Sequence, residues 1–90
     1  MEFAEEVYVG RSIIDADTVV QLLKRGCIAH GVFCVCTKKN GKFLYEVMSC
    51  RELLKERNNT SEYTVRGIAA GKSEAFEVVR TMVEDCHDFV

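Results

Sequence analysis

The 90-residue chain contains no proline, no internal repeat and no low-complexity linker. A chain of this length buries only about 60–65 per cent of its unfolded surface, which is too little for two separate cores. It has no apolar stretch near the roughly 18 residues of a membrane span, and its N-terminus, MEFAEEVYVG, carries acids where a secretory signal carries Lys or Arg. We therefore expect one cytoplasmic domain, residues 1–90, with no membrane partner.

A strong net charge is also missing, since the formal charge is only −2. Such a balance gives no general attraction to nucleic acid or to anionic membranes. The basic cluster that stands out is Lys38, Lys39 and Lys42, and it lacks the aromatic side chains on which single-strand binders stack bases. We interpret these lysines as charges that keep an exposed hairpin unpaired, and we expect no nucleic-acid partner.

The five cysteines are an odd number in a chain without an export signal, so a disulfide framework is not expected. Cys34 and Cys36 lie on a predicted strand, where both thiols share one face and act as small buried hydrophobes. The metal or catalytic alternative would combine residues far apart in sequence: Cys27, His30 and either Cys50 or Cys86 with His87. Their spacing is not that of zinc ligand pairs, so we predict no metal, no cofactor and no catalytic residue.

Hydrophobic residues make up 48% of the chain, which favours a folded domain. Their pattern predicts a first strand over Phe3–Ile14 with a bend at Gly10. A helix follows, with Asp15 or Asp17 as its cap and Gly26 as its stop. The alternative is that the segment TVVQLL forms another strand.

A hairpin is predicted from VFCVCTKK and KFLYEVMS on either side of Asn40-Gly41, a dipeptide typical of type I′ turns. Both faces of its strands are largely apolar, so helices or another copy of the protein should cover both. A two-residue loop would pair Cys36 with Tyr45, Cys34 with Val47 and Phe33 with Met48.

The sequence Ser49-Cys-Arg-Glu52 has the form of a capping box and predicts a short helix over Cys50–Arg57. A polar loop over Asn58–Ser61 and a strand over Glu62–Arg66 follow. In that strand, Tyr63 and Val65 share one side, and Thr64 and Arg66 the other.

The longest amphipathic helix is predicted at the C-terminal end, with Ser73 as its N-cap. Its apolar residues recur at the spacing that places them on one face, which must bury against something. These residues are Ala75, Phe76, Val79, Met82, Val83, Cys86 and Val90. Beyond them, Phe89 and Val90 either fold back onto the core, which we favour, or offer a hook to a partner.

Together these elements predict a single small α+β domain of order β-α-β-β-α-β-α. Its mainly antiparallel sheet of about four strands has the Asn-Gly hairpin at its centre. The long C-terminal helix and one or two shorter helices pack on the sheet. Six of the elements match the β-α-β-β-α-β plan of ferredoxin-like folds, a plan that carries no function by itself.

The segment from Gly67 to Ser73, GIAAGKS, is the sharpest motif in the chain. It has the residue types of a phosphate loop, but three residues separate its glycines where that loop has four. We therefore predict a strand-to-helix turn. The alternative is a weak anion site at the helix start, made by Gly71, Lys72 and Ser73.

No catalytic constellation is visible, whereas the apolar content is high for so small a surface. We expect a non-enzymatic cytoplasmic interaction or regulatory module, a homodimer formed through the hairpin or the helix beside it. The alternative is a domain that binds a phosphorylated or carboxylated metabolite at Gly71, Lys72 and Ser73. An enzyme that uses Cys86, His87 or Cys27 ranks third.

Overall fold

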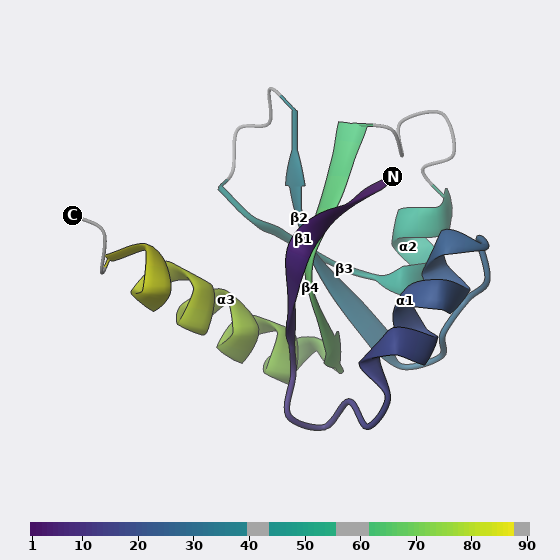
Figure 1. Cartoon of the computed structure of the whole chain (residues 1–90), viewed down its shortest axis with the longest axis horizontal. Helices are drawn as coiled ribbons and strands as arrows, with labels where there is room; N and C mark the ends of the chain where they lie inside the picture. The colour runs from purple at the N-terminus through teal and green to yellow at the C-terminus, as the bar shows by residue number, and fades with distance from the viewer. Residues whose placement is uncertain (40–43, 56–61, 88–90) are drawn as a thin grey trace.

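The computed structural model describes residues 1–39, 44–55 and 62–87 (Figure 1). Within these ranges the chain follows the predicted order β-α-β-β-α-β-α. The α+β class and the long C-terminal helix are confirmed. The elements are β1 (Glu2–Val9), α1 (Ala16–Lys24), β2 (Val32–Lys38), β3 (Glu46–Ser49), α2 (Cys50–Lys55), β4 (Tyr63–Ala70) and α3 (Lys72–His87).

The strands form one mixed sheet in the order β1-β4-β2-β3. β2 pairs antiparallel with both β3 and β4, whereas β1 pairs parallel with β4. β3 and β4 therefore run in the same direction on either side of β2, and α2 joins them as a split β-α-β unit. β1 and β2 run in opposite directions, so the first half of the chain does not form the second such unit. The ferredoxin-like arrangement is wrong for this reason.

The pairing of β2 with β3 is the predicted one, but its register differs by one residue. Cys34 lies opposite Met48, and Cys36 lies opposite Glu46. The connection between two strands sets their register, and residues 39–45 separate β2 from β3 where the prediction assumed a two-residue loop. The predicted Asn40-Gly41 turn itself lies outside the described residues.

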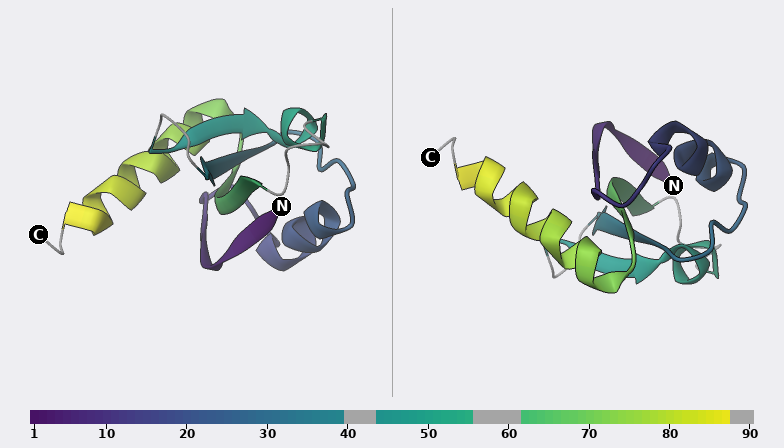
Figure 2. Two further views of the ribbon diagram at one scale, coloured as in Figure 1. Left: turned by 90° about the horizontal axis from the view of Figure 1, so that it is seen from above. Right: turned by 90° about the horizontal axis from the view of Figure 1, so that it is seen from below.

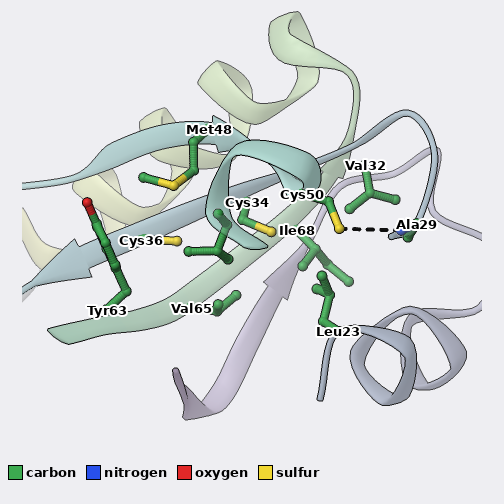
Figure 3. Close-up of a cluster of buried hydrophobic side chains, with 11 residues drawn as sticks. Leu23, Ala29, Val32, Cys34, Cys36, Met48, Cys50, Tyr63, Val65 and Ile68 are labelled. Carbon is green, nitrogen blue, oxygen red and sulfur yellow. Dashed lines mark hydrogen bonds between the residues drawn. The ribbon is translucent and has the colours of Figure 1, made fainter. Parts of the chain in front are cut away.

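Each face of the sheet is covered by helices, as the apolar hairpin strands predict. On one face, Leu23 of α1 and Leu53 of α2 pack with buried residues of β2 and β4 (Figure 3). On the other face, Ala75, Val78 and Met82 of α3 pack against the sheet. Figure 2 shows α3 extending beyond the sheet, away from the end of the molecule that carries α1 and α2.

The first strand is shorter than its pattern predicts, because it ends at Val9 rather than at Ile14. The Gly10 N–H donates to the carbonyl of Ile68 at 2.8 Å, and the Ile13 N–H donates back to the Gly10 carbonyl at 3.0 Å. The chain therefore turns after Gly10, where the prediction expected only a bend. Ile14 is left fully exposed in the connection to α1.

The predicted helix after this connection is confirmed, and the strand alternative for TVVQLL is wrong. Asp15 is the N-cap of α1: one carboxylate oxygen accepts the Thr18 hydroxyl at 2.7 Å and the other accepts the Thr18 N–H at 3.1 Å. These two hydrogen bonds, the hydroxyl first, lower the pKa of Asp15. Gly26, with φ of +76°, lies just beyond the C-cap and suits the left-handed backbone there.

The capping box at the start of α2 is also confirmed. The Glu52 N–H donates to the Ser49 hydroxyl at 3.1 Å, and the Ser49 N–H donates to the Glu52 carboxylate at 3.4 Å. The predicted helix end at Arg57 and the loop over Asn58–Ser61 lie outside the described residues.

The last strand continues past its predicted end at Arg66 and runs to Ala70. Tyr63 and Val65, predicted to share one side of the strand, are both buried, but Gly67 pairs with Val35 instead of opening a turn. The register between β2 and β4 shifts at this point, so Gly67 marks a strand irregularity. Of the two glycines in the motif, only Gly71 lies in the turn between β4 and α3. Among the described residues, no helix is long and apolar enough to cross a membrane.

Candidate functional site

The predicted anion site lies where β4 passes into α3. Gly71 has φ of +107°, and its carbonyl accepts the Ala75 N–H at 3.1 Å. That bond is the first of the helix, so Gly71 occupies the N-cap position that was predicted for Ser73. The glycine holds this position because its backbone lies in the left-handed region. Lys72 and Ser73 are exposed in the first turn of α3.

The anion that does lie at this turn is the carboxylate of Glu74. It accepts the Ala70 N–H at 2.7 Å and the Ser12 N–H at 3.0 Å. The hydrogen bond from the Ala70 backbone, and then those from the side chain and the backbone of Ser12, lower the pKa of Glu74 from its usual 4.5. Glu74 therefore ties β4, α3 and the connection after β1 together. The anion-binding role of Gly71, Lys72 and Ser73 stays a prediction, and an external anion there would meet the charge of Glu74.

We expect Glu74→Gln to make stability less dependent on acid pH. A carboxylate whose folded pKa is lowered stabilises the protein above its unfolded pKa, and this contribution is lost as pH falls through the folded value. Wild type should therefore lose stability more steeply than Glu74→Gln below about pH 4.5. Urea unfolding measured in steps from about pH 7 to about pH 2.5 tests this.

Glu77→Gln is the matched control. The Glu77 carboxylate pairs at 3.5 Å with the guanidinium of Arg11, and both side chains are exposed. Exposed ion pairs contribute little to stability, so this variant should have the same acid profile as wild type. Parallel acid profiles for wild type and Glu74→Gln would show that the two backbone hydrogen bonds do not stabilise the ionised carboxylate.

Three of the four described cysteines lie in the core. Cys34, Cys36 and Cys50 are buried in the core beside Met48 (Figure 3). Burial, reinforced by the nearby Cys36 and Cys50, raises the pKa of Cys34. Burial and then the charge of Glu46 raise the pKa of Cys36 to about 12. Cys34 and Cys36 are therefore neutral thiols at ordinary pH, as predicted for small buried hydrophobes.

The thiol of Cys50 contacts the backbone of the connection after α1. Its sulfur accepts the Ala29 N–H at 3.3 Å (Figure 3). It also lies 3.9 Å from the carbonyl oxygen of Cys27. These contacts attach the connection after α1 to the start of α2. Cys27 and His30 are exposed on that connection.

Within residues 1–39, 44–55 and 62–87, no group of three His, Cys, Asp or Glu residues is placed to hold a metal ion. The predicted alternative with Cys86 and His87 lies outside the described side chains.

The predicted basic cluster at the hairpin is partly neutralised. Lys38 lies 3.8 Å from the Glu62 carboxylate, and its ammonium group lies 5.4 Å from the centre of the Tyr63 ring. Lys39 is exposed, and Lys42 falls outside the described residues.

The two flanks of α3 differ in character. On the flank toward β1, the Tyr8 hydroxyl donates to Asp85 at 2.6 Å, Arg11 pairs with Glu77, and Glu74 accepts from Ser12. β1 and β3 lie at opposite edges of the sheet, so the other flank of α3 faces the β3 side. That second flank consists of Phe76, Val79 and Val83.

This apolar flank is only partly covered. Phe76 is 54% exposed and Val83 is 38% exposed, although both were predicted to be buried with Ala75 and Met82. The apolar arc of α3 is wider than the part of the helix that the sheet covers. The sheet buries Ala75, Val78 and Met82, and the apolar residues further around the helix stay partly exposed.

The uncovered flank continues onto the edge of the sheet. Half-buried Phe33, Tyr45 and Val47 belong to the same cluster as half-buried Val79. β3 is an edge strand of the described sheet, so one side of its backbone has no strand beside it. We call the apolar flank of α3 together with Phe33, Tyr45 and Val47 the α3–β3 surface.

Sequence reasoning located the residues of this surface but not their exposure. The available signal was the width of the apolar arc, since a stripe of about 100° suffices for a helix that packs on one layer. Comparisons of the chain with protein-family models, with curated proteins and with solved structures give no match.

Proposed function

We propose that this protein is a cytoplasmic, non-enzymatic interaction module that self-associates through the α3–β3 surface. The observation that carries the proposal is the row of Phe76, Val79 and Val83 along α3, with Phe76 54% and Val83 38% exposed. An apolar row that adjoins an edge strand is typical of an association site, whereas single exposed apolar residues are ordinary.

A second copy of the chain is the occupant that the charges of α3 favour. Lys72 lies at the start of the helix, whereas Glu84 lies near its end. In a two-fold dimer with antiparallel α3 helices, Lys72 of one copy would approach the acidic end of the other. The same arrangement brings Glu84 near the positive end of the partner helix, which compensates for its unfavourable place in its own helix.

The size of the surface predicts a weak dimer. A helix of 16 residues is about 24 Å long, and one flank is roughly 10 Å wide. That footprint falls short of the ~800 Å² that each partner contributes to a stable interface, even when the β3 edge is added. We therefore expect association in the micromolar range of concentration.

The titratable groups described above support the non-enzymatic part of the proposal. Active sites usually shift pKa values toward the working pH. Here the shifts run the other way, because Cys34 and Cys36 are held as neutral thiols and Asp15 and Glu74 as carboxylates bonded to backbone N–H groups.

We expect Phe76→Asp to weaken self-association at least about tenfold, because a carboxylate would be desolvated at the centre of the interface. Light scattering over a range of protein concentrations measures the solution mass. Wild type should shift from monomer toward dimer as concentration rises, whereas Phe76→Asp should stay monomeric.

Ile14→Asp is the matched control, since Ile14 is fully exposed and lies in the connection between β1 and α1, which contacts the flank of α3 opposite Phe76. It should associate like wild type. A wild-type protein that stays monomeric at about 1 mM, or a Phe76→Asp variant that associates equally well, would rule out the proposed surface.

A further inference from the structure

A groove lies between the end of α1, the start of β1 and α2, at the end of the molecule away from the C-terminal part of α3 (Figures 1 and 2). Its larger hollow has a volume of about 520 Å³, and an adjoining hollow of about 270 Å³ shares Gly26 and Leu54 with it. The apolar lining consists of Met1, Phe3, Leu23, Ile28 and Leu54.

Four cations surround this apolar lining. Lys24 and Arg25 border the larger hollow, and Arg51 and Lys55 border the smaller one. None of the four forms an ion pair with another described residue, since the described salt bridges lie elsewhere. A protein with a net charge of −2 therefore gathers around one groove four cations that pair with no described acid. We call it the basic groove.

The local structure explains only part of this charge. Lys24 and Arg25 suit the negative end of α1, and the Lys24 ammonium lies 5.5 Å from the centre of the Phe3 ring. Arg51, however, is in the first turn of α2, where the helix dipole disfavours a cation. It is also four residues from Lys55, a like-charge spacing that weakens a helix. Lys55 suits the last turn of α2, whereas the position of Arg51 has no such local benefit.

Two nearby features limit where the positive potential extends. The hollow on the other side of Lys24, between β1 and α1, contains Glu5 and Asp17 and is of mixed charge. The last carbonyls of α1 accept the N–H groups of Arg25, Gly26 and Cys27, so they are engaged within the helix end. The cations of the groove therefore lie along α2 and at the C-cap of α1.

We propose that the basic groove binds an acidic amphipathic segment of a partner protein. The partner's apolar side chains would enter the two hollows, and its carboxylates would pair with Lys24, Arg25, Arg51 and Lys55. Ile28, which is 42% exposed, lies where such a side chain would contact it. This binding goes beyond self-association and uses none of the α3–β3 surface.

The apolar lining favours this partner over a nucleic acid. A phosphate backbone would pair with the cations but would leave the lining in water. Base stacking needs exposed aromatic faces, and the aromatic residue of the groove, Phe3, is half-buried beneath Lys24. An amphipathic peptide satisfies both the charges and the lining.

The test uses a fluorescent model peptide of about 18 residues, with leucines along one helical face and glutamates along the other. Fluorescence anisotropy should show binding to the wild-type protein with a Kd of ~100 μM. The double variant Arg51→Glu, Lys55→Glu should bind about tenfold more weakly, and Ile28→Ser should also weaken binding. Raising the salt from about 0.05 M to about 0.5 M should weaken the wild-type complex.

The matched control is the double variant Lys39→Glu, Arg66→Glu, which makes the same change in net charge at exposed residues outside both the groove and the α3–β3 surface. It should bind the peptide like wild type, and circular dichroism should confirm that all variants fold. If both double variants weakened peptide binding equally, net charge alone would explain the effect, and the basic groove would be ruled out as the binding site. Binding to vesicles rich in phosphatidylserine but not to the peptide would overturn the peptide as occupant, and so would the absence of peptide binding at about 1 mM.

Discussion

Leu53→Ala should destabilise the protein by about 3–5 kcal/mol, the largest effect that we expect from a single substitution. Leu53 is fully buried on α2 and belongs to the cluster that includes Leu23, Cys34 and Ile68. Removing its branched end leaves a cavity that a stiff sheet and a short helix cannot fill. The loss is comparable to half or more of the stability of many small domains.

The neighbouring Leu54 provides a matched control on the same helix. Leu54 is half-buried at the basic groove, so Leu54→Ala should cost about 1 kcal/mol. Leu44 is 69% exposed, and Leu44→Ala should leave stability nearly unchanged. Urea unfolding at neutral pH gives the three differences. Similar losses for Leu53→Ala and Leu54→Ala would contradict the packing of α2 against the sheet.

Features of this fold that depend on neighbouring residues could be predicted from the sequence. Asp15 with Thr18 and Ser49 with Glu52 form the expected caps, because each cap joins residues three positions apart. Features that depend on distant residues could not. Gly67 is a turn signal by composition, but its pairing with Val35 keeps it in a strand. The edge position of β1 beside β4 likewise follows from packing between distant segments.

The candidate surfaces divide in the same way. The apolar residues of α3 are visible in the sequence, but which of them the sheet covers depends on the direction in which α3 crosses it. That direction is fixed by contacts of Tyr8 and Ser12 with Asp85 and Glu74, more than 60 residues away. The basic groove joins Lys24 to Arg51 across the fold, and no spacing rule connects them.

The second large effect is expected at Gly67, where β4 passes under α3. A Cβ at this position would lie 2.9 Å from Cγ1 of Val78 and 3.5 Å from both the Cβ and the carbonyl oxygen of Tyr8. Val78 is buried and β-branched, so its side chain has little freedom to rotate away. Gly67→Ala should therefore destabilise the protein by about 1–3 kcal/mol. By itself, the loss of backbone freedom in the unfolded chain would stabilise the variant by about 0.4–1 kcal/mol, so a net loss reports the collision.

A double-mutant cycle with Val78→Ala separates this collision from other effects of the alanine. Val78→Ala alone removes the Cγ1 atom and leaves a cavity, which should cost about 2 kcal/mol. In the double variant the new Cβ of residue 67 occupies part of that space. The double variant should therefore be more stable than the sum of the two single changes predicts, by about 1 kcal/mol. Strict additivity in urea unfolding would mean that α3 does not lie against Gly67. The placement of α3 that leaves Phe76 exposed would then be contradicted as well.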